Sequence, residues 1–437
     1  MIKKKSILFT LCLILPLILA INSCNTGKIE KEAVFAPAKG EEPSYPYFNI
    51  PVVDISGDTS RQVIVDKEEG QYLGHPTTVL LEDNKTILCV YPKGHGRGAI
   101  VYKRSNDAGL TWGDRLETPA SWLTSKEVPT IYRVTDAEGK KRIIIFSGLY
   151  PARMAVSEDD GKTWSELDSI GDWGGIVVMG ALTGLNTGKG HYMAFFHDDM
   201  RFFTADGQEK YRADRAINDS PQFSLYITIS IDGGLSWFVP KLIYKSRDMH
   251  LCEPGVVRSP DGKQLAMLLR ENSRRTNSQV MFSDDEGKTW GDPVPLPNAL
   301  TGDRHVPRYS PDGRLVISFR DISPRAYHNE ILELSEERGE KNYDILAAES
   351  GKGSPTEGDW VAWVGTYDDL VKGGEGQYRI RLKDNKNGWD TSYPSVEVLP
   401  DGTFVMTTYG HWDKGESPYI LSVRFKLEET DQIAYSE

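Results

Sequence analysis

The sequence predicts a six-bladed β-propeller, an all-β fold. Three observations predict it: an eight-residue pattern that recurs four times, a regular alternation of apolar strands with tight turns, and a composition suited to short strands. Of the 437 residues, 41 are glycine, 24 are proline and 10% are aromatic. Aromatic residues favour strands, whereas glycine and proline favour turns, so this composition indicates many short strands joined by turns.

The recurring pattern reads S-x-D-x-G-x-[TS]-W. Its four copies are residues 105–112, 157–164, 230–237 and 283–290. In a hairpin turn the aspartate can accept hydrogen bonds from the backbone, and the glycine permits a positive φ. The tryptophan that ends each copy is expected to pack between neighbouring repeats. We therefore interpret the aspartates of the pattern as structural rather than catalytic.

A second rhythm divides the chain into six units. In each unit an apolar strand, a turn and further strands follow one another. The units begin near Gly74, Val128, Gly175, Cys252, Arg304 and Tyr393. Repeats of this size with four short strands each are typical of propeller blades. Only the first four units carry the eight-residue turn.

Two units carry long insertions after their second strand, at residues 198–221 and from residue 321 to about residue 359. The second insertion is strongly charged, and a short helix is expected near residues 331–338. In a propeller, the loop after the second strand lies at the same end as the start of the first strand. Both insertions are therefore expected to border the binding face, opposite the eight-residue turns.

The first residues predict export. Lys3, Lys4 and Lys5 precede an apolar run at residues 7–21 that is short for a membrane span and typical of a signal peptide. The run ends in a segment that resembles a bacterial lipobox, which implies lipidation of Cys24. The alternative is an ordinary signal peptide with an incidental cysteine.

These features give the predicted domain organisation. A lipoprotein signal peptide at residues 1–23 is followed by a lipidated N-terminus and tether at 24–45 and by the propeller at 46–437. The expected location is the outer membrane, on its periplasmic or cell-surface side, with the lipid as the membrane anchor.

Charge and cysteine content exclude other classes. The formal net charge of -12 repels phosphate backbones, so nucleic acid is not expected as a partner. Cys89 and Cys252 lie in apolar, strand-like contexts and are expected to be buried thiols rather than a disulfide or a metal pair. The sequence has no metal-ligand spacing, and we expect no cofactor.

The four S-x-D-x-G-x-[TS]-W boxes between blade-like strands resemble those of the sialidase (neuraminidase) superfamily, where they are called Asp-boxes or BNR repeats. The resemblance covers roughly residues 70–425. It implies the sialidase fold and an exo-α-sialidase-like glycoside hydrolase that cleaves a terminal acidic sugar from glycans. Sialidases bind the substrate carboxylate with three arginines, whose guanidinium groups match it geometrically. Their nucleophile is a tyrosine activated by a glutamate, and their acid/base is an aspartate.

Three segments carry this resemblance to individual residues. CEPGVVRSPDGKQLAMLLREN, which begins at Cys252, resembles the segment with the glutamate and one arginine, and implies Glu253 as base and Arg270 as a substrate-binding arginine. TSYPSVEVLPDGTFVMTTYGHW resembles the nucleophile segment and implies Tyr393 as nucleophile. GQYRIRLKDN resembles the segment of another arginine, which falls on Arg379, with Arg381 on the same strand face as the alternative.

The first unit departs from the family pattern. Where sialidases have an arginine, this chain has Gly74 followed by His75, and the stretch at residues 91–97 lacks the acid/base aspartate. His95 in that stretch is the candidate proton donor, because a histidine titrates near neutral pH. Lys93 and Arg97 beside it can attract an anion, although a plain loop role fits the stretch equally well.

Further polar residues fall at equivalent positions near the axis. The candidates for substrate binding are Arg270, Arg379, Arg320, Arg304, His75, Lys93 and His197. Glu127, Asp198, His305, Asp321 and His411 occupy similar strand ends.

Three functions remain open. The leading one is hydrolysis of a terminal acidic sugar, where a uronic acid or a sulfated sugar would explain the altered first unit. A polysaccharide lyase or another glycosidase on the same propeller is the second, with a histidine and a tyrosine as acid and base at C5 of a uronate. The third is a surface lipoprotein that binds glycans without turnover.

Overall fold

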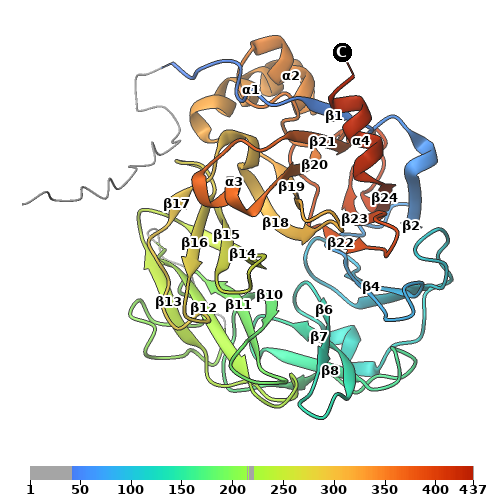
Figure 1. Ribbon diagram of the computed structural model, residues 1–437, viewed down its shortest axis with the longest axis vertical. Helices are drawn as coiled ribbons and strands as arrows, with labels where there is room; N and C mark the ends of the chain where they lie inside the picture. Colours follow the sequence, from blue (N-terminus) through green and yellow to red (C-terminus); the bar gives the residue numbers. More distant parts are fainter. Residues whose placement is uncertain (1–41, 214, 216–220, 437) are drawn as a thin grey trace, which may run out of the picture. The chain divides into compact units, whose positions relative to one another are not determined.

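The computed structural model describes residues 42–213, 215 and 221–436. They belong to a compact unit that spans Ala33–Glu437 and form a six-bladed β-propeller, as predicted (Figure 1). The six first strands begin within three residues of the predicted unit starts. The predicted signal peptide, Cys24 and most of the tether lie outside the described residues.

Each blade is a sheet in which consecutive strands pair antiparallel. Blade one contains β3 (Thr77–Leu80), β4 (Ile87–Pro92) and β5 (Ile100–Ser105). Blade two contains β6 (Thr130–Thr135), β7 (Lys141–Ser147), β8 (Arg153–Ser157) and β9 (Asp168–Ser169). Blade three contains β10 (Ile176–Gly184), β11 (Tyr192–Asp198), β12 (Phe223–Ser230) and β13 (Lys241–Ser246).

The other three blades follow the same order. Blade four contains β14 (Leu251–Arg258), β15 (Leu265–Glu271), β16 (Gln279–Ser283) and β17 (Val294–Pro295). Blade five contains β18 (Gly302–Tyr309), β19 (Leu315–Asp321), β20 (Trp360–Gly365) and β21 (Tyr378–Lys383). Blade six contains β22 (Ser395–Val398), β23 (Phe404–Gly410) and β24 (Tyr419–Phe425). The first strands of neighbouring blades contact one another around the axis.

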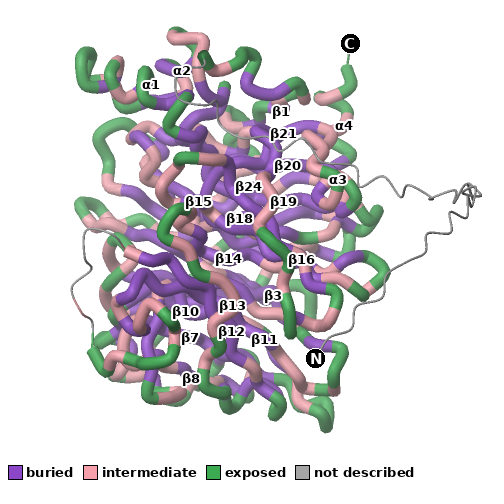
Figure 2. Tube along the Cα trace, turned by 90° about the vertical axis from the view of Figure 1, so that its left-hand side faces the viewer, coloured by how far each residue is buried: buried purple, intermediate pink, exposed green. Residues whose placement is uncertain are grey.

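The N-terminal part of the described chain completes the last two blades. The strand β2 (Gln62–Asp66) pairs antiparallel with β24, and β1 (Val52–Asp54) pairs parallel with β21. Strands from both ends of the described chain, β2 and β24, thus lie in one sheet, which closes the ring. Because every blade packs its faces against two neighbours, the strands are buried and the connecting turns are exposed (Figure 2).

The four Asp-box turns are structural, as predicted, and each lies after the third strand of its blade. In the first, Asp107 accepts hydrogen bonds from the backbone N–H of Thr111 at 2.9 Å and from its hydroxyl at 2.6 Å. The N–H of Gly109 donates to Ser105 Oγ at 2.8 Å. The same bonds recur in the other three copies. The aspartates are therefore saturated by their own turns, which leaves them no catalytic part.

The insertion in blade five holds more helix than the sequence predicted. Besides α1 (Arg325–Arg338), which starts earlier than expected, it contains α2 (Tyr343–Ser350). The two helices form a small apolar cluster of their own around Ile331 and Leu346. Part of the first insertion, residues 214 and 216–220, lies outside the described residues.

The remaining helices are short. They are α3 (Tyr367–Lys372) and α4 (Leu427–Ala434), with the 3₁₀ turns η1 (Thr59–Arg61), η2 (Ala120–Thr124) and η3 (Asn298–Leu300). No helix among the described residues is long and apolar enough to cross a membrane. Cys89 and Cys252 are buried free thiols, as predicted.

Candidate active site

The starts of four first strands carry residues in the left-handed region of φ. His75, Val177, Glu253 and Arg304 have φ between 51° and 57°. At the last three the pairing of the first and second strands is also interrupted by a β-bulge. Non-glycine residues adopt this conformation at a cost and cluster at functional sites, and bulges re-aim side chains there. The repeated kink turns these residues toward the axis at one end of the ring.

The predicted nucleophile and base are in contact. The Tyr393 hydroxyl donates a hydrogen bond to Glu253 Oε1. Burial alone would raise the pKa of Glu253, but the neighbouring Arg270 guanidinium outweighs it and holds that pKa below its usual value. Burial and the Glu253 charge raise the pKa of Tyr393. The pair is therefore a neutral phenol bonded to an ionised carboxylate, which can take the phenolic proton.

Beside this pair, three arginines converge on one buried aspartate. Arg270 Nη1 lies 3.0 Å from Glu253 Oε1, and its Nε lies 3.2 Å from Asp303 Oδ1. Arg274 and Arg320 approach Asp303 Oδ2 to 2.9 and 2.6 Å. Asp303 is 1% exposed. Burial would raise its pKa, but the three guanidinium groups hold it well below the usual value.

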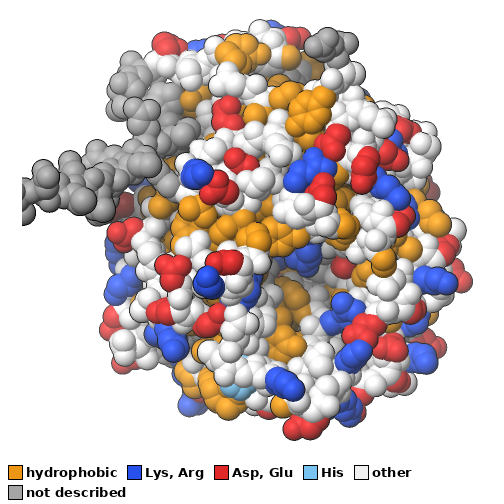
Figure 3. All heavy atoms as spheres, in the orientation of Figure 1, with side chains coloured by type: hydrophobic (Ala, Val, Ile, Leu, Met, Phe, Trp, Pro, Cys, Tyr) orange, Lys and Arg blue, Asp and Glu red, His pale blue; other side chains and the backbone are white. Residues whose placement is uncertain are grey.

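Charge therefore accumulates in this arginine cluster, which we define as Arg270, Arg274 and Arg320. Its three guanidinium groups face two carboxylates, Glu253 and Asp303. The balance is positive by one charge, in a setting where burial reduces screening by water. In the space-filling view, one end of the ring is hollowed near its middle, and basic side chains lie at the edge of the hollow (Figure 3).

Arg320 joins the cluster because it repeats the position of Arg270. Arg270 pairs with Cys252 at the end of β15, and Arg320 pairs with Asp303 at the end of β19. The two arginines thus occupy equivalent places in adjacent blades. Arg274 and Asp303 were missed by sequence reasoning. Asp303 occupies in blade five the place that Cys252 occupies in blade four, opposite the arginine of the second strand. This equivalence could have revealed Asp303 as a partner of Arg320.

The structure does not bring Arg379 to this cluster. Its side chain is fully buried on β21 and pairs with Asp321 at 2.8 Å. It also donates to the hydroxyls of Ser354 and Thr356 at 2.9 and 3.3 Å. The alternative, Arg381, pairs with Asp359 at 2.7 Å and with Asp344. Both arginines lie on β21, the fourth strand of blade five, and hold the insertion of that blade against it. Because β21 is the fourth strand, it lies away from the axis.

His75 packs directly against the nucleophile. Its ring centroid lies 4.2 Å from that of Tyr393 and 4.6 Å from that of Tyr409, with which it is stacked. Burial, together with nearby His95, lowers the pKa of His75 well below its usual value, so the imidazole is neutral. Its Nδ1 accepts from the N–H of Gly96 at 3.2 Å, which assigns the proton to Nε2, toward Tyr409.

His95 belongs to a second polar network beside His75. The side chain is 66% exposed, and its Nδ1 lies 2.7 Å from the Tyr72 hydroxyl and 3.5 Å from Asp390. Tyr72 and His411 both bond to Asp390, at 2.7 and 2.8 Å. Burial would raise the pKa of Asp390, but the bonds from His411, His95 and Tyr72 hold it well below the usual value. Asp390 was also missed by sequence reasoning.

Several other candidates support the site without facing it. Lys93 pairs with Glu68 at 2.9 Å. His197 accepts from the N–H of Glu253 at 3.4 Å, and burial lowers its pKa to about 4. Burial raises the pKa of Glu127 to about 7, and its carboxylate accepts from the N–H groups of Val177 and Val178.

The last of these candidates are loop and core residues. Asp198 accepts backbone bonds from Met200, Phe202 and Phe203, and burial raises its pKa to about 7. The buried ring of His305 stacks on Phe319, with Nε2 3.0 Å from the Leu300 carbonyl oxygen. The Asp198 bonds fix the turn after β11, and the His305 contact joins β18 to η3.

Six blades, four Asp-box turns and a tyrosine–glutamate pair at the axis define a sialidase-like propeller. The chain belongs to the BNR repeat-like domain family, whose sequence model matches residues 146–406. A search of curated proteins found no match to the sequence. The predicted superfamily is thereby confirmed, and it supports a role in glycoside hydrolysis or glycan binding.

Solved structures share the fold at low sequence identity. A protein of unknown function from Dyadobacter fermentans superposes with a TM-score of 0.57 at 14% identity, covering 83% of this chain and 97% of its own. The intramolecular trans-sialidase from Ruminococcus gnavus gives 0.51 at 13% identity, with coverage of 82% and 95%. A leech intramolecular trans-sialidase gives 0.52 at 14% identity, with 83% and 69% covered. At these identities the similarity shows the fold alone.

Proposed function

We propose that this protein is a retaining glycoside hydrolase that cleaves a terminal acidic sugar from glycans. The observation that carries the proposal is the hydrogen bond from the Tyr393 hydroxyl to buried, ionised Glu253. Such a pair suits attack on an anionic sugar, because a neutral phenol approaches it with less repulsion than a carboxylate does. The trans-sialidases with the same fold act on acidic sugars, which supports this substrate class.

The residues divide the reaction between them. Tyr393 Oη bonds to the anomeric carbon as the glycosidic C–O bond breaks, and the phenolic proton passes to Glu253. His95 gives a proton to the leaving oxygen. In the second step His95 takes a proton from water, which attacks the anomeric carbon and breaks the bond to Tyr393. Glu253 then returns the proton to the phenolate, so the two inversions retain configuration.

The arginine cluster accounts for an acidic substrate. Its surplus positive charge attracts a carboxylate, and guanidinium groups bind carboxylates with two parallel hydrogen bonds. Asp303 already accepts from the cluster, so only part of the cluster's donors remain for a ligand. The position of the first sialidase arginine falls on Gly74, with neutral His75 beside it. Because of these differences, we expect the site to bind the substrate carboxylate less tightly than three free arginines would.

The assay that tests this proposal uses aryl glycosides of N-acetylneuraminic acid, glucuronic acid and galacturonic acid, with neutral galactoside as control. We expect turnover of at least one acidic glycoside and none of the neutral one. Proton NMR of the first product should show the same anomeric configuration as the substrate. Binding of acidic glycans without turnover would contradict the hydrolase and indicate a glycan-binding protein, and an inverted product would exclude Tyr393 as nucleophile.

The role of His95 as acid gives a prediction that depends on the leaving group. His95→Ala is expected to slow cleavage of a natural glycan by about 10²-fold, because general acid catalysis typically contributes that much. An aryl glycoside with an acidic phenol needs no proton, so its cleavage should change far less. The measurement is kcat/KM for both substrates. An equal loss on both would show that His95 only shapes the site.

A lyase is the second candidate, favoured by one contact. Neutral His75 lies against Tyr393, and a histidine and a tyrosine could serve as acid and base at C5 of a uronate. β-Elimination forms a C4–C5 double bond that absorbs in the ultraviolet, whereas hydrolysis does not. An absorbing product from a polyuronate would therefore replace the hydrolase with the lyase.

We also propose that the protein is an exported lipoprotein anchored through Cys24. The proposal rests on the basic residues, the apolar run and the lipobox-like segment at the start of the chain. In cells fed radiolabelled or alkyne-tagged palmitate, the wild-type protein should incorporate label and partition with membranes. Cys24→Ala should lose the label and be released. Label retained in Cys24→Ala would contradict the assignment.

A further inference from the structure

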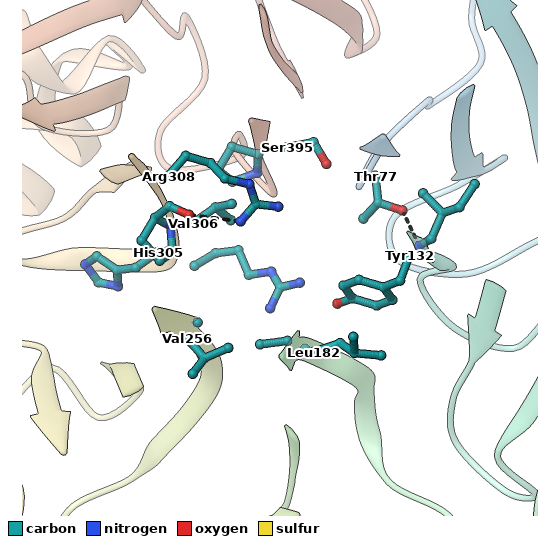
Figure 4. Close-up of a pocket in the computed structure, with 15 residues that line it drawn as sticks. Thr77, Tyr132, Leu182, Val256, His305, Val306, Arg308 and Ser395 are labelled. Carbon is teal, nitrogen blue, oxygen red and sulfur yellow. Dashed lines mark hydrogen bonds between the residues drawn. The ribbon is translucent and has the colours of Figure 1, made fainter. Parts of the chain in front are cut away.

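A second pocket lies on the propeller axis, beyond the Tyr393 site. It has a volume of about 100 Å³, and all six first strands line it. The lining residues labelled in Figure 4 include Thr77, Tyr132, Leu182, Val256, Val306 and Ser395. On the four strands with a kinked residue, these lining residues lie two to five positions beyond it. Pockets for small organic ligands usually measure about 300–1,000 Å³, so a sugar does not fit, whereas a small ion does.

Arg304 reaches into this pocket from β18. It is 4% exposed, and its Nε and Nη1 have no hydrogen-bond partner among the described residues. A Cβ placed on Gly180 would lie 3.2 Å from Nη1, so the guanidinium reaches β10, two blades away from β18. Its Cζ is 5.6 Å from the ring centroid of Tyr393. An unpaired buried guanidinium is costly, and a counter-anion would remove most of that cost.

The other polar groups of the pocket do not compensate Arg304. The Tyr132 hydroxyl donates to the Met179 carbonyl at 2.9 Å, and Thr77 donates to the Pro129 carbonyl at 3.1 Å. Arg308 is exposed and points into the pocket in Figure 4, where it adds a second positive charge. The remaining walls, such as Leu182 and Val256, are apolar.

Two carboxylates act on these arginines through their charge, Glu127 on Arg304 and Glu397 on Arg308, but both carboxylates are hydrogen-bonded to other groups. Glu127 accepts from the N–H groups of Val177 and Val178. Glu397 accepts from the Thr78 hydroxyl at 2.9 Å. The pocket therefore combines buried positive charge, free donors and a small volume.

We propose that the axial pocket binds a small inorganic anion of the size of chloride, with Arg304 as its principal ligand. Nε and Nη1 supply charge-assisted hydrogen bonds, which are the stronger kind. The site is separate from the arginine cluster, whose guanidinium groups are bonded to Glu253 and Asp303. The proposal gives Arg304 an anion as its ligand, in place of the substrate that the sequence suggested. The proposal does not depend on glycosidase activity.

The decisive experiment uses bromide, which scatters anomalously, in place of chloride. Crystals of the purified protein grown without halide are soaked in sodium bromide, and an anomalous peak is expected within hydrogen-bonding reach of the Arg304 guanidinium. A wild-type map without that peak, or with peaks only at the arginine cluster, would overturn the proposal. This measurement needs no variant.

Thermal unfolding provides the matched comparison. Raising bromide from 1 to 100 mM, with gluconate keeping the ionic strength constant, should raise Tm by about 2 °C, because a ligand that binds only the folded state stabilises it. Arg304→Gln should lose this dependence, whereas Arg308→Gln, at the exposed position, should keep most of it. An equal response in Arg304→Gln and wild type would refute the assignment.

Discussion

Replacing Tyr393 with phenylalanine is expected to lower kcat/KM by at least about 10³-fold, because it removes the nucleophile and the proton that Glu253 receives. The exchange takes away one oxygen and its hydrogen bond to Glu253, while the ring that packs against His75 remains. The measurement is hydrolysis of the acidic glycoside that the wild-type protein turns over best. Circular dichroism and Tm confirm that the variant is folded.

Tyr102→Phe is the matched control for this loss. Tyr102 is buried, and its hydroxyl donates to the Gly161 carbonyl at 2.7 Å, away from the axis. The variant should lose about 1 kcal/mol of stability, the usual worth of such a bond, and keep its activity. If Tyr393→Phe kept more than a tenth of wild-type activity, the proposed nucleophile would be refuted.

The largest expected effect on stability comes from Asp303→Asn. The substitution leaves Arg270, Arg274 and Arg320 around a neutral amide, and breaking a buried ion pair by removing one partner typically costs about 3–5 kcal/mol. The measurement is the free energy of unfolding from urea denaturation at neutral pH. Asp368→Asn removes the same charge from the exposed helix α3, where an ion pair contributes little, and should be nearly neutral. A comparable small effect at both positions would show that Asp303 is not the centre of the cluster.

The contribution of Asp303 to the free energy of unfolding should fall as the pH falls. Its pKa in the folded protein lies well below the value of about 3.9 for an unfolded aspartate. A depressed folded pKa stabilises the folded state fully above the unfolded pKa and loses that stabilisation as the pH falls through the folded pKa. The difference in unfolding free energy between wild type and Asp303→Asn should therefore be constant from about pH 5 to pH 8 and shrink below about pH 4.

The sequence predicted what short-range signals encode. The Asp-box turns and the strand rhythm identified the propeller, because each blade repeats within a few tens of residues. Tyr393, Glu253 and Arg270 were predicted from the resemblance of their segments to those of sialidases, and each lies at the start or end of a strand. The structure brings the three into contact, although Tyr393 precedes the first strand of blade six and the other two lie in blade four.

The sequence could not reveal which strand of blade five carries each arginine. Arg379 and Arg320 both end or border strands of blade five, but β21 is the fourth strand and lies far from the axis, whereas β19 is the second. Asp303 was overlooked because its burial between three guanidinium groups is a tertiary property. Asp390 lies in the connection between blades five and six, where no periodicity marks a residue as central.

The pairing of β2 with β24 has a consequence for how the protein folds. Gln62 is the partner of Val423, so the sheet that closes the ring joins strands from opposite ends of the described chain. During synthesis the earlier blades can assemble while β2 still has no partner, and closure waits until β24 (Tyr419–Phe425) has been made. Contacts of such long sequence separation are slow to form, because the entropy of closing the loop precedes any gain from pairing. Loss of the last strand would therefore also leave β2 without its partner and the ring open.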